Sequence, residues 1–183
     1  MVARLVQLSD VVRFFSRPIR ALDGRVIRGI AQVPTRQPRV FDGTFIPRLL
    51  LKVAPDERLD QGTLLIDSDG NRYIAVSFSE DAYFNSRVKH TFVLMLINAD
   101  VVWTRSASTM EPISGLRVPA PDVQLGTIPV VLEADKPEVD VLKVNAQSYK
   151  VLSNQPLQLG DRLNGMTIKQ VTILNGVTNA HCY

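Results

Sequence analysis

Residues 48–82 read RLLLKVAPDERLDQGTLLIDSDGNRYIAVSFSEDA, and this stretch decides the fold class. Short runs of aliphatic and β-branched residues alternate with turn-forming Pro, Asp, Gly and Asn, which is typical of consecutive strands. We expect strands over residues 45–53, 63–66 and 73–78, with Pro47 at a sheet edge or bulge. Asp69-Gly70 indicates a hairpin turn, because glycine tolerates a positive φ.

The same spacing of short strands and turn signals continues on both sides of this stretch. It predicts an all-β fold, a small β-barrel or sandwich with a short N-terminal helix and long loops or arms. The further strands are expected at residues 26–33, 91–98, 101–106, 127–132, 139–144, 149–152 and 166–174.

The N-terminal residues have a pattern that predicts a short helix. Ser9 can cap a helix that starts at Asp10, and Pro18 ends it because proline lacks the amide donor. Charges are scattered through the segment, so it does not resemble a signal peptide. It can dock on a partner or on the protein's own body, and a helix lying on a membrane surface is the alternative.

Composition divides the chain into three regions. Residues 1–40 read as a basic arm with the short helix, and residues 41–110 as a β-barrel-like domain. Residues 111–183 begin with a Pro-rich linker and hold a second β unit, which either stands alone or completes the first domain. Residues 69–78 and 145–154 echo each other (DGNRYIAVSF and NAQSYKVLSN), either by chance or because the β units are related.

Charge is distributed unevenly along the chain. The net charge is +3, but residues 1–60 hold eleven basic and six acidic residues, and residues 61–183 hold ten and twelve. Arginine, which suits planar multidentate contacts, outnumbers lysine by 15 to 6. The arginines can form an interface or simply a solvated basic face. The residues that we predict in an interface are Arg13, Arg17, Arg20, Arg25, Arg28 and, as an anchor or core residue, Trp103.

Motifs for chemistry are weak throughout, and we expect no catalytic, cofactor-binding or metal site. The segment 67–71 (DSDGN) resembles a calcium loop, but its glycine comes two positions early and no Glu follows at the twelfth position. Glu80-Asp81 lacks a second placed acid or base. His181-Cys182 lies at the C-terminus, where we expect a mobile chain rather than an oriented nucleophile pair.

Other function classes find little support. Cys182 is the one cysteine, which excludes a disulfide scaffold, and one cysteine with two histidines argues against a zinc site with nitrogen and sulfur ligands. No apolar run approaches the roughly 20 residues of a membrane helix. A monomeric nucleic-acid-binding β-barrel stays an alternative because of the basic N-terminal third, although no aromatic stacking motif accompanies it.

The stretch at residues 48–82 resembles the first β-hairpin region of tailed-bacteriophage head-completion proteins, also called head-closure, stopper or head–tail joining proteins. The matching positions follow a loose family pattern of glycines, apolar residues and a tyrosine: Gly62, Leu65, Gly70, Tyr73 and Val76. The downstream run TFVLMLINADVVWTR continues the resemblance, which covers about residues 40–106. Residues 1–40 and 111–183 are additional to the often shorter members of this family.

This resemblance implies a structural virion protein that is made in the host cytoplasm and acts by binding, without a cofactor. It would form a hexameric or dodecameric ring at the head–tail neck, between the portal or adaptor and the tail proteins. Such a ring would help to retain packaged DNA in the channel, without contact to a membrane. A tail-terminator, tail-tube or baseplate protein is the alternative within the virion, since these share overlapping β architecture.

Overall fold

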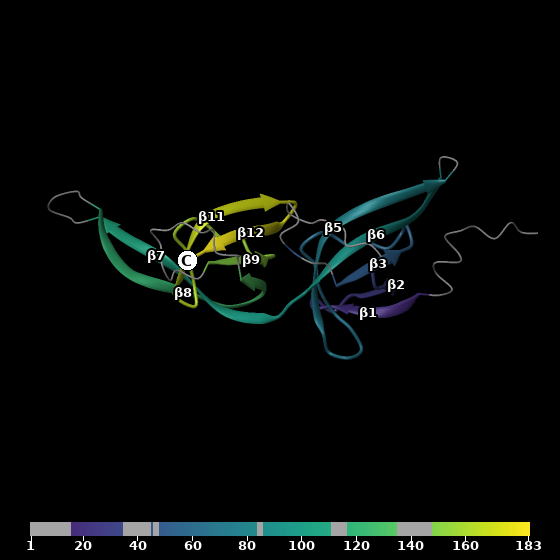
Figure 1. Cartoon of the computed structure of the whole chain (residues 1–183), viewed down its shortest axis with the longest axis horizontal. Helices are drawn as coiled ribbons and strands as arrows, with labels where there is room; N and C mark the ends of the chain where they lie inside the picture. Colours follow the sequence, from purple (N-terminus) through teal and green to yellow (C-terminus); the bar gives the residue numbers. More distant parts are fainter. Residues whose placement is uncertain (1–15, 35–44, 46–47, 84–85, 111–116, 135–147) are drawn as a thin grey trace, which may run out of the picture. The chain divides into compact units, whose positions relative to one another are not determined.

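The computed structural model describes residues 16–34, 45, 48–83, 86–110, 117–134 and 148–183. Every regular element in these ranges is a β-strand, which confirms the all-β fold class (Figure 1). The helix expected from Asp10 lies mainly outside the described residues. The chain divides into two compact units, residues 1–97 and 98–183, and each is described by itself.

The first unit is a closed six-stranded barrel in which every pair of neighbouring strands is antiparallel. Its strands follow the spatial order β1-β2-β3-β6-β5-β4, and β4 pairs back onto β1. Closure removes the open edges that a sheet of this size would otherwise expose. The strands are β1 (Arg17–Ala21), β2 (Val26–Gln32), β3 (Leu49–Val53), β4 (Leu64–Ile66), β5 (Arg72–Tyr83) and β6 (Ser86–Leu96).

The second unit is also a closed antiparallel six-stranded barrel. Its spatial order, β7-β8-β9-β12-β11-β10, repeats that of the first barrel when each unit's strands are counted from its own start. The strands are β7 (Ala99–Met110), β8 (Arg117–Ala134), β9 (Tyr149–Ser153), β10 (Arg162–Leu163), β11 (Met166–Leu174) and β12 (Val177–Cys182).

Equivalent main-chain hydrogen bonds occur within each of the two barrels, in addition to the common strand order. The Gly62 N–H donates to the Ala75 carbonyl over 2.7 Å, and the Gly160 N–H donates to the Ile168 carbonyl over 3.0 Å. Both glycines have a positive φ, of 82° and 86°, which favours glycine at this turn. The carbonyl of the residue after each glycine then accepts a hydrogen bond in return: Thr63 from the Ala75 N–H, and Asp161 from the Ile168 N–H. These matches make Gly62 equivalent to Gly160 and Ala75 equivalent to Ile168.

Strand registers extend this equivalence around both barrels. Ile19 pairs with Ile27 as Val101 pairs with Ile128, and Leu51 pairs with Phe92 as Val151 pairs with Ala180. Most of these positions are buried in the two hydrophobic cores. The equivalent buried pairs, with the first-barrel residue first, are Ile19/Val101, Ala21/Trp103, Ile27/Ile128, Leu51/Val151, Leu59/Leu157, Leu65/Leu163, Ala75/Ile168, Phe92/Ala180 and Leu94/Cys182.

The internal echo of the sequence does not correspond to this repeat. Residues 69–78 lead into β5, the fifth strand of the first barrel, whereas residues 145–154 contain β9, the third strand of the second. Both segments place a tyrosine at the start of a strand, which explains their similarity. The two β units are related in structure, but the two sequence segments that suggested a repeat are not at equivalent positions.

Three expectations about the ends and the middle of the chain differ from the structure. β1 and β2 belong to the first barrel, so the domain does not begin at residue 41. β8 occupies much of the expected Pro-rich linker and pairs with β7. The C-terminal β12 is not a mobile end, because it pairs with β9 and β11 and buries Cys182 completely. The expected strand over residues 139–144 lies outside the described residues.

Each barrel carries one long two-stranded arm. β5 and β6 remain paired from Tyr73 to Tyr83, beyond the short segment of β5 that pairs with β4. β7 and β8 remain paired out to Met110 and Arg117, although β10 pairs with β7 only at Trp103 and Thr104. Figure 1 shows both pairs extending as ribbons from their barrels. Part of what the sequence suggested as long loops is therefore regular hairpin.

Candidate functional site

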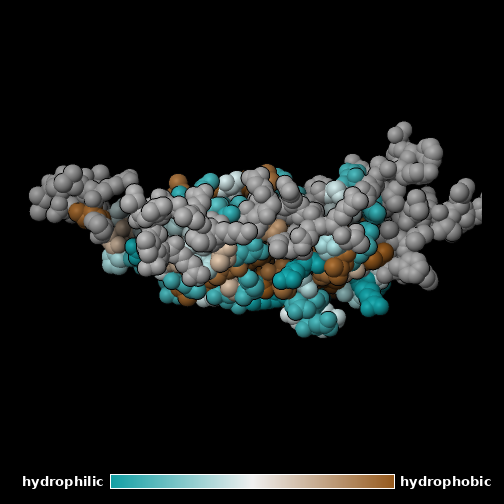
Figure 2. Space-filling model, in the orientation of Figure 1, coloured by the Kyte–Doolittle hydropathy of each residue, from teal (hydrophilic) through white to brown (hydrophobic). Residues whose placement is uncertain are grey.

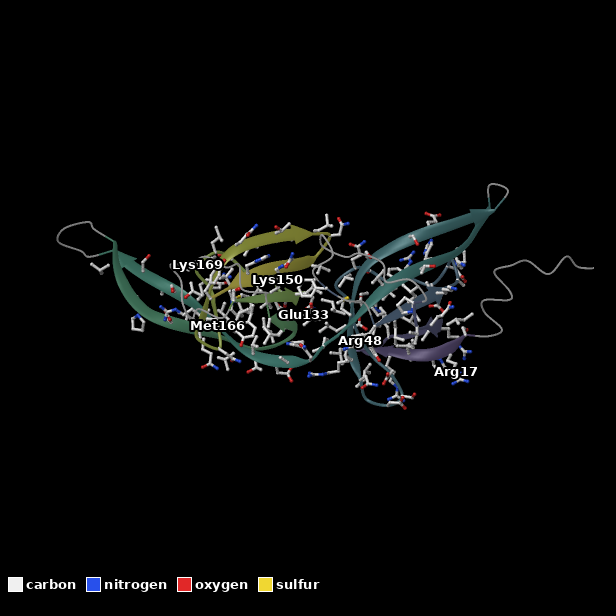
Figure 3. The ribbon with its side chains drawn as sticks, in the orientation of Figure 1. Arg17, Arg48, Glu133, Lys150, Met166 and Lys169 are labelled. Atoms are coloured by element: carbon white, nitrogen blue, oxygen red, sulfur yellow. The ribbon has the colours of Figure 1, made fainter. Side chains whose placement is uncertain are left out.

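Four of the predicted interface arginines lie on the first barrel. Arg17 and Arg20 are on β1, Arg25 is in the turn after it and Arg28 is on β2, and all four are exposed. The side chains of Arg20 and Arg28 are on the outside because Ile19, Ala21 and Ile27 take the inward positions of these strands. Arg17 lies at the start of β1 (Figure 3). Arg13, the fifth predicted arginine, lies outside the described residues.

The exposed arginines differ in their partners. Arg25 Nε donates to Asp23 Oδ2 over 2.7 Å, and Arg25 also donates to the Arg58 carbonyl. In the described part of the chain, Arg17, Arg20 and Arg28 have no ion pair. Arg28 lies opposite Pro18 and Arg20 lies opposite Val26, which makes the two arginines diagonal neighbours on one outer surface. This surface can attract an acidic partner or a phosphate backbone.

One end of the first barrel is open and contains a cavity of about 390 Å³. Ile19, Leu49 and Leu94 provide apolar walls, while Arg17 and Ser68 provide polar groups. The other residues that line it are Pro18, Gly29, Ile30, Ala31, Asp67 and Tyr73. Its volume is in the range of small-ligand sites.

The equivalent end of the second barrel has larger side chains on the second strand. Gly29 and Ala31 of β2 correspond to Val130 and Leu132 of β8 by strand register. Asn98 also fixes the end of β8, because its side-chain amide donates to and accepts from the main chain of Leu132, both over 2.8 Å. The two barrels therefore differ in side-chain size at this end although they have the same strand order.

The turn beside this cavity is organised by the Asp67 carboxylate. It accepts hydrogen bonds from the main-chain N–H groups of Asp69 and Asn71, from the Asn71 amide and from the Tyr73 hydroxyl. Burial opposes ionisation of Asp67, but these bonds outweigh it and lower the pKa. Burial and the bond to Asp67 raise the pKa of Tyr73 to about 12. The expected hairpin is present, with Gly70 at φ 83°.

A buried polar cluster lies in the second barrel. Asp161, only 1% exposed, accepts a 2.9 Å hydrogen bond from Trp103 Nε1 and two from Arg105, at 2.8 and 2.9 Å. The Gln158 N–H also donates to it, and the Arg105 guanidinium lies 5.3 Å from the centre of the Trp103 ring. Burial raises the pKa of Asp161, but the bonds from Arg105, Trp103 and Gln158 outweigh burial, so the pKa lies below its usual value.

This cluster links β7 to the segment before β10, and the polar groups of Asp161 and Trp103 are buried from solvent. Trp103 is 8% exposed and belongs to the core, which is the core role that the sequence left open beside an interface role. All polar groups of Asp161 face partners within the barrel. Sequence reasoning missed Asp161 and Arg105, because they are 56 residues apart and only the closed barrel brings them together.

The remaining candidates for chemistry do not converge. Cys182 is fully buried, and burial raises its pKa to about 11, which disfavours a nucleophilic thiolate. Glu80 lies opposite His90 across the β5–β6 arm. Within the described ranges no group of three or more His, Cys, Asp or Glu residues could hold a metal ion. Those ranges also contain no helix long and apolar enough to cross a membrane.

The surfaces that can contact other molecules are thus the basic outer face of β1 and β2, the open end of the first barrel and the two arms. Figure 2 shows hydrophobic and hydrophilic residues interspersed over the visible face of the described residues. Exposed aliphatic residues lie on or near the second arm, including Val102, Val123 and Leu125. Comparison of the chain with protein-family models, curated proteins and solved structures found no match.

Proposed function

We propose that this chain is a structural subunit that acts by binding proteins, and that its place is the head–tail neck of a tailed-phage virion. The observation that carries the binding function is the pair of long arms that extend beyond closed barrels. A two-stranded hairpin is marginally stable in water by itself, so each arm gains stability when a partner covers it. The neck location rests on the resemblance of residues 48–82 to head-completion proteins.

In this proposal, copies of the chain form a ring between the portal or adaptor and the tail, and the ring helps to retain packaged DNA. Ring closure requires a heterologous contact, in which one surface of each copy meets a different surface of the next. The basic face with Arg20 and Arg28 and a more acidic surface on the neighbouring copy or ring form a complementary pair. The acidic excess of residues 61–183 fits this arrangement.

The test starts from the virion. Antibody labelling of purified particles, combined with quantitative mass spectrometry, is expected to place the chain at the neck in six or twelve copies. Labelling along the tail would favour the tail-tube alternative, and labelling at the tail tip would favour a baseplate protein. Absence of the chain from purified particles would overturn the proposal.

A second function is favoured by one observation: Arg17, Arg20 and Arg28 lack ion pairs in the described part of the chain. A monomeric nucleic-acid-binding barrel would use them on phosphates, and its affinity would fall steeply with salt. Titration of the full chain with a duplex oligonucleotide at two salt concentrations tests this. The double variant Arg20→Gln, Arg28→Gln is expected to reduce the salt slope by about 2 if both contact phosphate.

A further inference from the structure

The edges of the β7–β8 arm differ in their capacity to pair with another strand. Beyond Thr104, no other strand of the described residues pairs with β7 on the side opposite β8, because β10 starts at Arg162, which lies opposite Thr104. On β8, Pro119 lies opposite Ser108, so the outer edge of this strand lacks an N–H donor there, and Pro121 follows in the stretch where the register shifts between the Arg105–Val123 and Ala107–Ala120 pairs. Proline on an edge is a common protection against strand addition. The β7 edge lacks this protection.

Hydrogen bonding shows which groups point outward from β7. Val102 donates its N–H to Asn164 Oδ1 and accepts from the Asn164 N–H, so its main chain faces β10. Alternate residues of a strand face the same side, and the two register shifts of this arm place their extra residues on β8, so Thr104, Ser106, Ser108 and Met110 of β7 are assigned to that edge. The pairing of Ser108 with Pro119 agrees, because a proline cannot donate to it. For Ser106 and Ser108 the described structure gives these main-chain groups no partner.

We propose that the β7 edge binds the same edge of a second copy of this chain, in antiparallel register about Ser108. Ser108 would lie opposite Ser108, and Ser106 opposite Met110, so that outward groups meet outward groups over about six main-chain hydrogen bonds. Residues 106–110 (SASTM) carry no charge, so no like charges are opposed. Ser106 and Ser108 are exposed and small, which allows the strands to approach.

The one-sided protection of the arm also argues for a second copy as the occupant. If both edges of the arm could pair with another copy, successive copies would add without limit. Because the β8 edge is blocked and only the β7 edge is open, the assembly stops at a dimer. This pairing goes beyond the proposed function, because it is isologous and does not itself form a ring. It holds whether or not the chain is located at a phage neck.

The first experiment measures the mass of the full chain by sedimentation over a range of concentrations. The wild type is expected to form a dimer. Ser108→Pro removes one outward N–H without removing a β7–β8 hydrogen bond, and is expected to weaken the dimer at least tenfold. Ser108→Thr keeps the N–H, and Arg117→Pro adds a proline to the protected β8 edge, so both should dimerise like the wild type. Trp103 fluorescence checks that each variant is folded.

The second experiment reads the register directly. Ser108→Cys, in a Cys182→Ser background, should form an intermolecular disulfide on mild oxidation, because directly opposed residues have Cα atoms within disulfide range. Val123→Cys, which is exposed on β8 in the same arm, should not. A monomeric wild type, or a dimer unchanged by Ser108→Pro, would overturn the proposal. A wild type that is monomeric but captures an extended segment of another virion protein would assign the edge to that protein, and the neck proposal would survive.

Discussion

The first and second barrels place side chains of different size at equivalent positions. Ala21 on β1 corresponds to Trp103 on β7, whereas Phe92 on β6 corresponds to Ala180 on β12. Each barrel therefore has a large aromatic residue in its core, but on a different strand. Cores tolerate such exchanges when the total volume and the inward pattern are retained. The shared strand order depends on that pattern and on the glycine turn, and not on particular core residues.

The two barrels also differ in a polar residue at an equivalent position. Thr63 is equivalent to Asp161, since both accept the return hydrogen bond that follows the glycine. Only Asp161 receives side-chain bonds from a Trp and an Arg of the first strand of its barrel. The second barrel is thus stabilised by a buried carboxylate where the first has none, and the first has a cavity at an end where the second has bulkier residues.

The largest predicted effect concerns Asp161. Asp161→Ala leaves the Trp103 N–H buried without an acceptor and removes both bonds of Arg105, so we expect a loss of about 2–4 kcal/mol, moderated because Arg105 is partly exposed. Urea unfolding is followed by Trp103 fluorescence, which reports on the second barrel because the chain has one tryptophan, and by circular dichroism, which also reports on the first barrel. Thr63→Ala is the matched control and should cost under 1 kcal/mol. Equal losses in the two variants would contradict the asymmetry.

The stabilisation from Asp161 should also depend on pH. Its pKa is lowered in the folded state, so the stabilising contribution is full above the unfolded pKa near 3.9 and is lost as the pH falls through the lower folded value. We expect the stability difference between wild type and Asp161→Ala to shrink when urea unfolding is repeated in increasingly acidic buffers. A difference that stays constant into strong acid would show that the carboxylate charge does not matter.

The next effect concerns Gly29, which is equivalent to Val130. A Cβ at position 29 would lie 2.5 Å from Leu51 Cδ1 and 3.0 Å from the Lys52 carbonyl oxygen, so Gly29→Val should destabilise the first barrel by about 1–3 kcal/mol. The added change Leu51→Val reproduces the Val130 and Val151 pair of the second barrel and should recover part of the loss. Circular dichroism during urea unfolding measures both. No recovery in the double variant would show that the residues of the two barrels are not interchangeable.

The sequence predicted the strands where the alternation was strong. β11 matches the expected residues 166–174, and β9 extends the expected residues 149–152 by only Ser153. β1 was missed because Arg17, Pro18 and Arg20 leave only Ile19 and Ala21 as inward apolar residues. β12 was missed because its sequence, VTNAHC, is mostly polar or small, although its pairing with two strands buries it.

The repeat and the polar cluster could not be predicted from local sequence. Exchanges such as Ala21/Trp103 remove sequence similarity at the equivalent core positions. The contact between Arg105 and Asp161 depends on the two-residue strand β10, which brings residues 162 and 163 against β7. So short a strand has no periodicity to detect, and its position is set by closure of the barrel. The polar cluster around Asp161 thus depends on strand pairing in the closed barrel and not on the local strand propensity of the sequence.

The smallest effect concerns Tyr73, whose equivalent by register is Met166, which is labelled in Figure 3. Tyr73→Phe removes the hydroxyl that donates to Asp67 over 3.1 Å, while three other donors to Asp67 remain, so we expect a loss of about 0.5–1.5 kcal/mol at neutral pH.

The pH dependence distinguishes this hydrogen bond from simple packing. The folded pKa of Tyr73 is about 12, above an unfolded value near 10, so the contribution of the neutral phenol is full below pH 10 and is lost as the pH rises toward 12. Unfolding of wild type and Tyr73→Phe at increasing pH should therefore converge over that window. Ionisation of Cys182 affects both proteins equally and cancels in the difference, whereas Met166→Leu, at the equivalent position, should show no such window. A stability difference between wild type and Tyr73→Phe that persisted to pH 12 would mean that Tyr73 stabilises the open end of the first barrel by packing alone.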